Sequence, residues 1–315
     1  MSRRVLTATA TLVGFALFAW AVRRVGAGEI LDGVRRVGWG FVAILAVGGA
    51  RFLVRATSWR LCMAPGTQLT LAQSFSAFLA GDAVGSVTPL GLVASEPTKV
   101  FLTRHHLATR ESVASLALEN LVYGLSVLTM VAVGLTVLLA TVPLPSTWRT
   151  IALVILAGLI AALVLALWML KPGPREATDS ADGWRARLTE VIGEVRRFSA
   201  THPARLWKVF AFDLLCHGLA IAEGYIALGW LLGSARPTVA QAIVFEALNR
   251  AVIVAFKFVP FRVGVDEAMT GELAQLLAGN PAAGVALAVV RKVRNLFWVG
   301  VGLALVSAHP ARTTK

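Results

Sequence analysis

The sequence has few charged residues and few cysteines for its length. Only 15% of its 315 residues are charged, whereas soluble domains have roughly 25%. The two cysteines, Cys62 and Cys216, lie within or beside apolar stretches, so neither a disulfide framework nor a cysteine metal site is expected. HExxH pairs, P-loops, dinucleotide fingerprints and nucleophile elbows are all missing. We therefore expect no metal and no cofactor, although an enzyme built at a membrane surface stays open.

Apolar residues make up 57% of the chain and fall in blocks close to the ~20 residues that cross a bilayer. The blocks lie near 5–22, 39–59, 69–88, 112–142, 149–170, 206–232, 238–260 and 283–307. The first block runs into Arg23-Arg24 without a small-residue cleavage site, so we expect a retained helix. The pattern predicts an all-α, polytopic transmembrane helix bundle of about eight spans.

The net charge of +13 does not indicate a nucleic-acid partner. The basic residues flank apolar blocks and do not alternate with aromatic residues, as they do in single-strand binding proteins. Basic loops beside membrane spans instead face anionic headgroups and fix orientation. We expect no nucleic-acid binding.

Two semi-apolar stretches, about 90–107 and 261–281, begin just after a proline and are too short to span. They fit either re-entrant segments or surface loops with a short interfacial helix. A polar linker at about 171–205 contains an amphipathic segment from Trp184 to Phe198, which we expect in the headgroup plane. The chain reads as one integral membrane domain, 1–315, with halves at about 1–142 and 149–308.

The two halves share an ordered pattern of residues. In the first half, LTLAQ is followed by Pro89, Glu96 and Glu119; in the second half, PTVAQ is followed by Pro260, Glu267 and Arg291. The spacings within the two series agree to within a few residues. Four spans per half would return the chain to the same side and give parallel repeats. Paired interrupted segments at equivalent positions are typical of a transport site.

Charged residues inside a membrane are costly and are normally paired or functional. Asp82 lies among small residues ahead of the first break, and Glu96 lies one turn before Lys99, where a solvated cap is the alternative. Glu119 and Tyr123 belong to a polar stripe that we expect to face the bundle interior.

The second half carries a matching set of polar residues. Arg291 is the best candidate to neutralise Glu96, Glu119 or Glu267, because its planar guanidinium suits carboxylate and phosphate groups. Arg294 is a second candidate for this pairing, although snorkelling to the interface is its alternative. Glu246 and Arg250 are spaced for a helical ion pair, either structural or substrate-binding.

Two further stripes suggest structural roles. Arg51, Arg55 and Trp59 recur every fourth residue and are interpreted as interfacial anchors. His217, between Asp213 and Glu223, is interpreted as a satisfied buried histidine in preference to a proton relay.

Five segments resemble the lysylphosphatidylglycerol synthase transmembrane-region family. They are the Arg55–Trp59–Arg60 pattern, GDAVGSVTPLGLVASEPTKVFL, SVASLALENLVYG, VPFRVGVDEA and AVVRKVRNLFWVGVG. The resemblance implies a flippase-like protein of the bacterial cytoplasmic (inner) membrane. It places Pro89, Gly91, Glu96, Glu119, Pro260, Gly264, Glu267 and Arg291 on characteristic positions. Asn120 stands where an arginine commonly follows the glutamate, and the glycine-rich run after the second proline is reduced to Arg262-Val263-Gly264.

These observations predict a flippase-like transporter for a polar or charged lipid headgroup. The expected partners are membrane lipids, either anionic or aminoacylated phospholipid or an isoprenoid-linked lipid, with a lipid-modifying enzyme as a further partner. The alternatives are a membrane-embedded enzyme acting on a lipid-linked sugar or isoprenoid phosphate, and a non-catalytic partner of a lipid-synthesis complex. The expected substrate-binding residues are Asp82, Pro89, Gly91, Glu96, Glu119, Tyr123, Pro260, Gly264, Glu267 and Arg291, with Glu246, Arg250, Arg294 and Asn295 in secondary roles.

Overall fold

The computed structural model describes residues 27–308 apart from 65, 68, 89–90, 170–192, 194, 234 and 257–263. Its regular elements within these ranges are all helices, so the predicted all-α class is confirmed. Three predicted features lie outside the described residues. They are the span near 5–22, most of the amphipathic linker, and the two prolines that interrupt apolar segments, Pro89 and Pro260.

The helices cover most of the predicted apolar blocks. They are α2 (Ala27–Val37), α3 (Gly40–Leu61), α4 (Leu71–Val87), α5 (Gly91–Thr103), α6 (Thr109–Thr141), α7 (Ser146–Met169), α9 (Pro203–Leu232), α10 (Val239–Ala255), α11 (Val265–Ala278) and α12 (Pro281–Ala308). Four of them, α3, α6, α7 and α9, are long and apolar enough to cross a membrane. The protein is therefore a helical membrane protein, and the count of eight spans stays a prediction.

Two short helices occupy the semi-apolar stretches. Helix α5 has 13 residues and α11 has 14. At about 1.5 Å per residue, neither spans the ~30 Å hydrocarbon core. A third short helix, α2, lies in the charged segment between the predicted apolar blocks 5–22 and 39–59. It forms because Val34 and Val37 pack against the core while Arg35 and Arg36 stay exposed.

Local sequence sets several helix ends. Thr70 caps α4 and Thr238 caps α10, each in a reciprocal capping box with the glutamine three residues later. Such a box satisfies two backbone N–H groups that a helix start otherwise leaves without partners. At the other end of α11, Gly279 adopts the left-handed conformation (φ +65°) that closes the helix.

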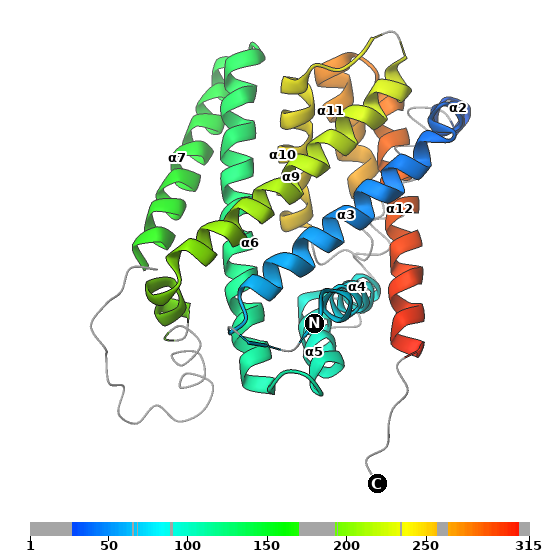
Figure 1. The fold of residues 1–315 in the computed structure, drawn as a ribbon. Helices are drawn as coiled ribbons and strands as arrows, with labels where there is room; N and C mark the ends of the chain where they lie inside the picture. Colours follow the sequence, from blue (N-terminus) through cyan, green and yellow to red (C-terminus); the bar gives the residue numbers. More distant parts are fainter. Residues whose placement is uncertain are drawn as a thin grey trace, which may run out of the picture.

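The helices of residues 40–141 and those of residues 203–308 form two sets, and corresponding helices of the two sets run in opposite directions (Figure 1). Helices α3 and α9 lie side by side and run in opposite directions, because Ile44 at the start of α3 packs with Leu228 and Leu231 at the end of α9. Helix α6 starts near the end of α3, and α12 starts near the end of α9, so α6 and α12 also run in opposite directions. The expectation of parallel halves is therefore wrong.

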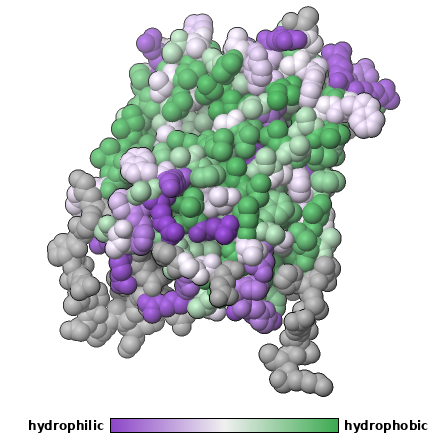
Figure 2. Space-filling model, in the orientation of Figure 1, coloured by the Kyte–Doolittle hydropathy of each residue, from purple (hydrophilic) through white to green (hydrophobic). Residues whose placement is uncertain are grey.

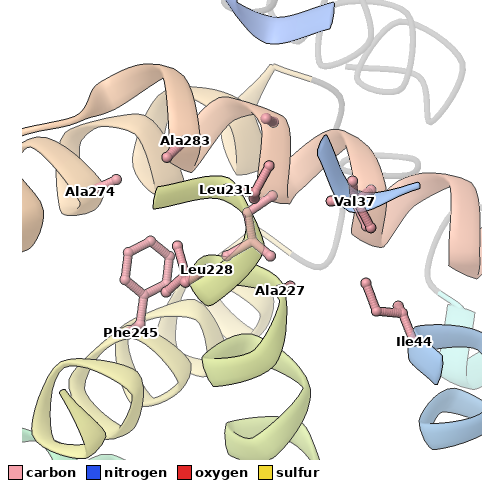
Figure 3. Packing of buried hydrophobic residues seen from close by; sticks show 11 residues of the cluster. Val37, Ile44, Ala227, Leu228, Leu231, Phe245, Ala274 and Ala283 are labelled. Carbon is pink, nitrogen blue, oxygen red and sulfur yellow. The ribbon is translucent and has the colours of Figure 1, made fainter. Parts of the chain in front are cut away.

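Apolar packing holds each end of the bundle together. Figure 3 shows Leu228 and Leu231 of α9 next to Phe245 of α10, with Val37 and Ile44 on the other side.

On the face seen in Figure 2, apolar residues cover the middle and upper part, and hydrophilic residues gather towards the lower part and the upper right. This distribution fits a lipid-facing belt between two polar ends.

Two glycines allow close crossings between helices that are far apart in the sequence. A Cβ built on Gly302 of α12 meets Ala83 Cβ and the Leu79 carbonyl oxygen of α4, each at 2.6 Å. A Cβ on Gly134 of α6 meets Ala247 Cβ of α10 at 2.0 Å. Small residues are favoured where membrane helices approach this closely.

We expect Gly302→Ala to destabilise the protein by about 1–3 kcal/mol, since the added methyl group overpacks the α4–α12 contact. Thermal unfolding in detergent measures the change. Gly300→Ala is the matched control, because its Cβ meets no atom within 4 Å. Equal stability of the two variants would contradict the close crossing.

Candidate functional site

A network of buried charged residues lies between α3, α6, α9, α10 and α12. Five acidic side chains are buried in the described part of the chain: Glu119, Asp213, Glu223, Glu246 and Glu267. Their partners are mainly arginines from other helices. Charge at this depth is tolerated because opposite charges offset the cost of desolvation.

The first ion pair joins α3 to α6. Arg55 Nη2 lies 2.7 Å from Glu119 Oε1, but the two groups are not aligned as a hydrogen bond. The guanidinium of Arg55 also lies 3.3 Å from the ring centroid of Tyr123, within cation–π range. Both predicted residues, Glu119 and Tyr123, therefore face the bundle interior, and Glu119 keeps oxygens without hydrogen-bond partners among the described residues.

The second cluster centres on Glu246 of α10. One carboxylate oxygen accepts a hydrogen bond from Arg250 Nε at 2.8 Å, and the other accepts one from Arg291 Nη2 at 2.9 Å. Arg250 also donates to the Tyr123 hydroxyl at 3.2 Å, which links this cluster to the first. Arg291 thus pairs with Glu246, and the predicted pairing with Glu96, Glu119 or Glu267 is wrong.

The third cluster centres on Glu223 of α9. Arg51 of α3 donates to one oxygen at 3.3 Å, and Arg294 of α12 pairs with the other. Arg294 also donates to Asn295 Oδ1, at 2.8 Å from Nη2. Arg294 is therefore a buried member of the network, not a residue that snorkels to the interface.

Glu96 of α5 has a different environment. One oxygen accepts a hydrogen bond from Lys99 Nζ at 2.8 Å, and the other is buried without a hydrogen-bond partner in the described part of the chain. Lys99 is itself buried and lies 4.0 Å from the centroid of Phe78, so the pair is not a solvated cap.

Glu96 also lines a groove of about 610 Å³ between α5 and α6. Apolar walls flank a few polar side chains in this groove. Its lining is Glu96, Pro97, Val100, Phe101, Arg104, Thr109, Val113, Leu116, Ala117 and Asn120. Phe101 and Val113 are exposed, so the groove opens on the outside of the bundle.

Glu267, the predicted counterpart of Glu96, is fully engaged. Oε2 accepts the Gly264 N–H at 2.7 Å, and Oε1 pairs with Lys292 of α12. Gly264 has φ +82°, which glycine adopts readily at the start of α11. Glu267 and Gly264 therefore fix the start of this helix.

The other predicted positions are less informative. Gly91 allows α5 to approach α4, since a Cβ there meets the Gly85 carbonyl oxygen at 2.8 Å. Asp82 is partly buried on α4.

Several members of the network were not singled out as site residues from the sequence. Arg51 and Arg55 are only 18% and 12% exposed, and Trp59 is fully buried, so their interpretation as interfacial anchors is wrong. Their four-residue spacing correctly predicted that they share one face of a helix. It could not show that this face packs against α9 and α6. Glu223 and Lys292 were also missed, because their ion-pair partners lie on other helices.

A charged network enclosed by membrane-crossing helices defines an integral membrane protein with a buried polar site. The family model described as the lysylphosphatidylglycerol synthase TM region matches residues 7–303, so the chain belongs to this family. Membership relates it to membrane-lipid handling. No curated protein and no solved structure matches the chain.

We expect Glu119→Gln to destabilise the protein by about 3–5 kcal/mol, because it leaves the Arg55 charge buried without its partner. The double variant Glu119→Gln/Arg55→Gln should recover part of this loss, as measured by unfolding in detergent. Asp32→Asn is the control, since the exposed Asp32–Arg35 pair contributes at most about 1 kcal/mol. Strictly additive losses in the double variant would rule out a stabilising pair.

Proposed function

We propose that this protein moves a phospholipid headgroup across the bacterial cytoplasmic membrane, as a flippase-like transporter. One observation carries the proposal: the buried network offers donors and acceptors that its own residues do not use. Family membership supports a lipid as the substrate.

The unused atoms suit a phosphate-bearing headgroup. Nε of Arg51, Nε of Arg55 and Nη1 of Arg291 are buried and have no hydrogen-bond partner among the described residues. Arginine donates in a planar fork that matches phosphate oxygens. Oε2 of Glu119, whose Oε1 is ion-paired with Arg55, can accept from a headgroup amine or hydroxyl. A headgroup in the network would therefore exchange its hydration for fixed protein groups.

The α5–α6 groove gives such a lipid a route from the bilayer. Its apolar walls, such as Val100, Phe101 and Leu116, suit an acyl chain, while Arg104 suits the phosphate. Glu96 lies in the same groove, and one of its oxygens is buried with no hydrogen-bond partner from the described residues. The acyl chain would stay against these apolar walls, which open on the outside of the bundle, while the headgroup enters the network.

An inverted repeat would provide access from both sides. The segments 40–141 and 203–308 run in opposite directions, and equal numbers of residues separate Thr70 from Thr238 and Gly134 from Gly302. The α4–α12 crossing at Gly302 corresponds to the α10–α6 crossing at Gly134. Arg55 of α3 and Glu223 of α9 are separated by the same number of residues, and each forms an ion pair with the long helix that ends its own half: Arg55 with Glu119 of α6, and Glu223 with Arg294 of α12. Inverted repeats are a common basis of alternating access.

Glu96→Gln tests the proposal. We expect it to slow translocation of fluorescent phosphatidylglycerol in proteoliposomes about tenfold, because one charge-assisted contact to the headgroup is lost. Its unfolding temperature should also fall, because the buried Lys99 ammonium is left with a neutral acceptor, so transport is compared at a temperature where both proteins are folded.

Glu267→Gln should act mainly by lowering the free energy of unfolding, because Glu267 holds the start of α11. Glu272→Gln, at an exposed position of the same helix, is the matched control and should leave transport unchanged. Wild-type protein that moves no lipid would refute the transporter proposal and leave the embedded-enzyme and complex-partner alternatives. Undiminished transport by Glu96→Gln would remove the groove from the route.

A further inference from the structure

Asp213 of α9 differs from the other buried acidic residues. Each of the other four in the described part of the chain has an arginine or lysine within ion-pair distance. The carboxyl group of Asp213 is fully buried, and its Oδ1 accepts only a hydrogen bond from Ser58 at 3.0 Å. Its Oδ2 has no hydrogen-bond partner among the residues that the structure describes.

This environment favours the neutral carboxylic acid. A buried carboxylate without a paired cation is strongly disfavoured in a membrane interior, and proton binding removes the charge. The hydroxyl of Ser58 stabilises Oδ1 in either state, so the proton belongs on Oδ2. Asp213 is therefore a carboxyl group that can bind or release a proton when its surroundings change.

Two charged groups, Arg55 of α3 and Glu119 of α6, act electrostatically on Asp213. Ser58, which donates to Asp213, lies one turn after Arg55 on the same helix. When Asp213 is neutral, Arg55 stays with Glu119. When Asp213 loses its proton, two carboxylates compete for one guanidinium, and Glu119 becomes available to a headgroup.

His217, one turn further along α9, extends the polar path. One ring nitrogen, Nε2, lies 3.0 Å from the Ser126 hydroxyl of α6, and the other has no hydrogen-bond partner within the described ranges. Its ring stacks on Tyr123 at a centroid distance of 5.5 Å. The charges facing it are Arg51 and Arg55 of α3 and Glu246 and Arg250 of α10.

We propose that lipid movement is coupled to a proton that binds Asp213, with His217 as the neighbouring relay, through competition between Asp213 and Glu119 for Arg55. This inference rests on the proposed transport function. The proton enters from one aqueous side onto Oδ2 and leaves to the other side in the state that releases the lipid.

Asp213→Asn tests the coupling, because asparagine keeps the shape of the neutral acid but cannot release a proton. In proteoliposomes, a pH gradient should shift the leaflet distribution of fluorescent phosphatidylglycerol several-fold with wild-type protein. With Asp213→Asn the gradient should have no effect. Asp32→Asn, at an exposed site on α2, should behave as wild type.

Infrared difference spectroscopy gives a readout that does not depend on transport. Wild-type protein near neutral pH should show a protonated carboxyl C=O band that is missing in Asp213→Asn. Two results would overturn the coupling and leave the transport proposal intact. One is lipid movement by the wild type that does not change with the pH gradient, and the other is identical carboxyl bands in the two proteins. Failure of the wild type to move lipid under any gradient would overturn the transport proposal itself.

Discussion

The need to neutralise charge inside a membrane is the constraint on which the rest of this structure depends. The bundle buries Glu119, Glu223 and Glu246 among apolar helices, where isolated charges are costly. Each is offset by an arginine that comes from a different helix or from the next helical turn. The network therefore fixes which helices must be neighbours, and its loss would leave charges buried without partners.

The balance within the network is also what makes a site. A fully satisfied set of ion pairs would only hold helices together, as Glu267 does with Gly264 and Lys292. Within the described part of the protein, Glu96 and Glu119 instead keep oxygens without hydrogen-bond partners, and several arginines keep such nitrogens. In the proposed mechanism, these atoms accept a headgroup, and the protonation state of Asp213 decides how firmly Arg55 holds Glu119.

Much of the fold could be predicted because hydropathy and local patterns act over short distances. The apolar blocks near 39–59 and 112–142 became α3 and α6, and the short stretches after the two breaks became α5 and α11. Helix α2 was missed because one apolar stripe on a charged segment of 11 residues is a weak signal. The direction of the two halves was wrong because it depended on an assumed number of spans.

The sequence by itself determined the helical membrane character, the inward-facing stripe of Glu119 and Tyr123, and the family. Helical periodicity and hydropathy carry this information locally. Only the tertiary structure decided the partners. Arg51 meets Glu223 across 172 residues, and Arg291 meets Glu246, because helix packing and not sequence spacing brings these charges together. For the same reason, tertiary structure alone distinguished Asp213, the buried acid without a paired cation, from its neighbours.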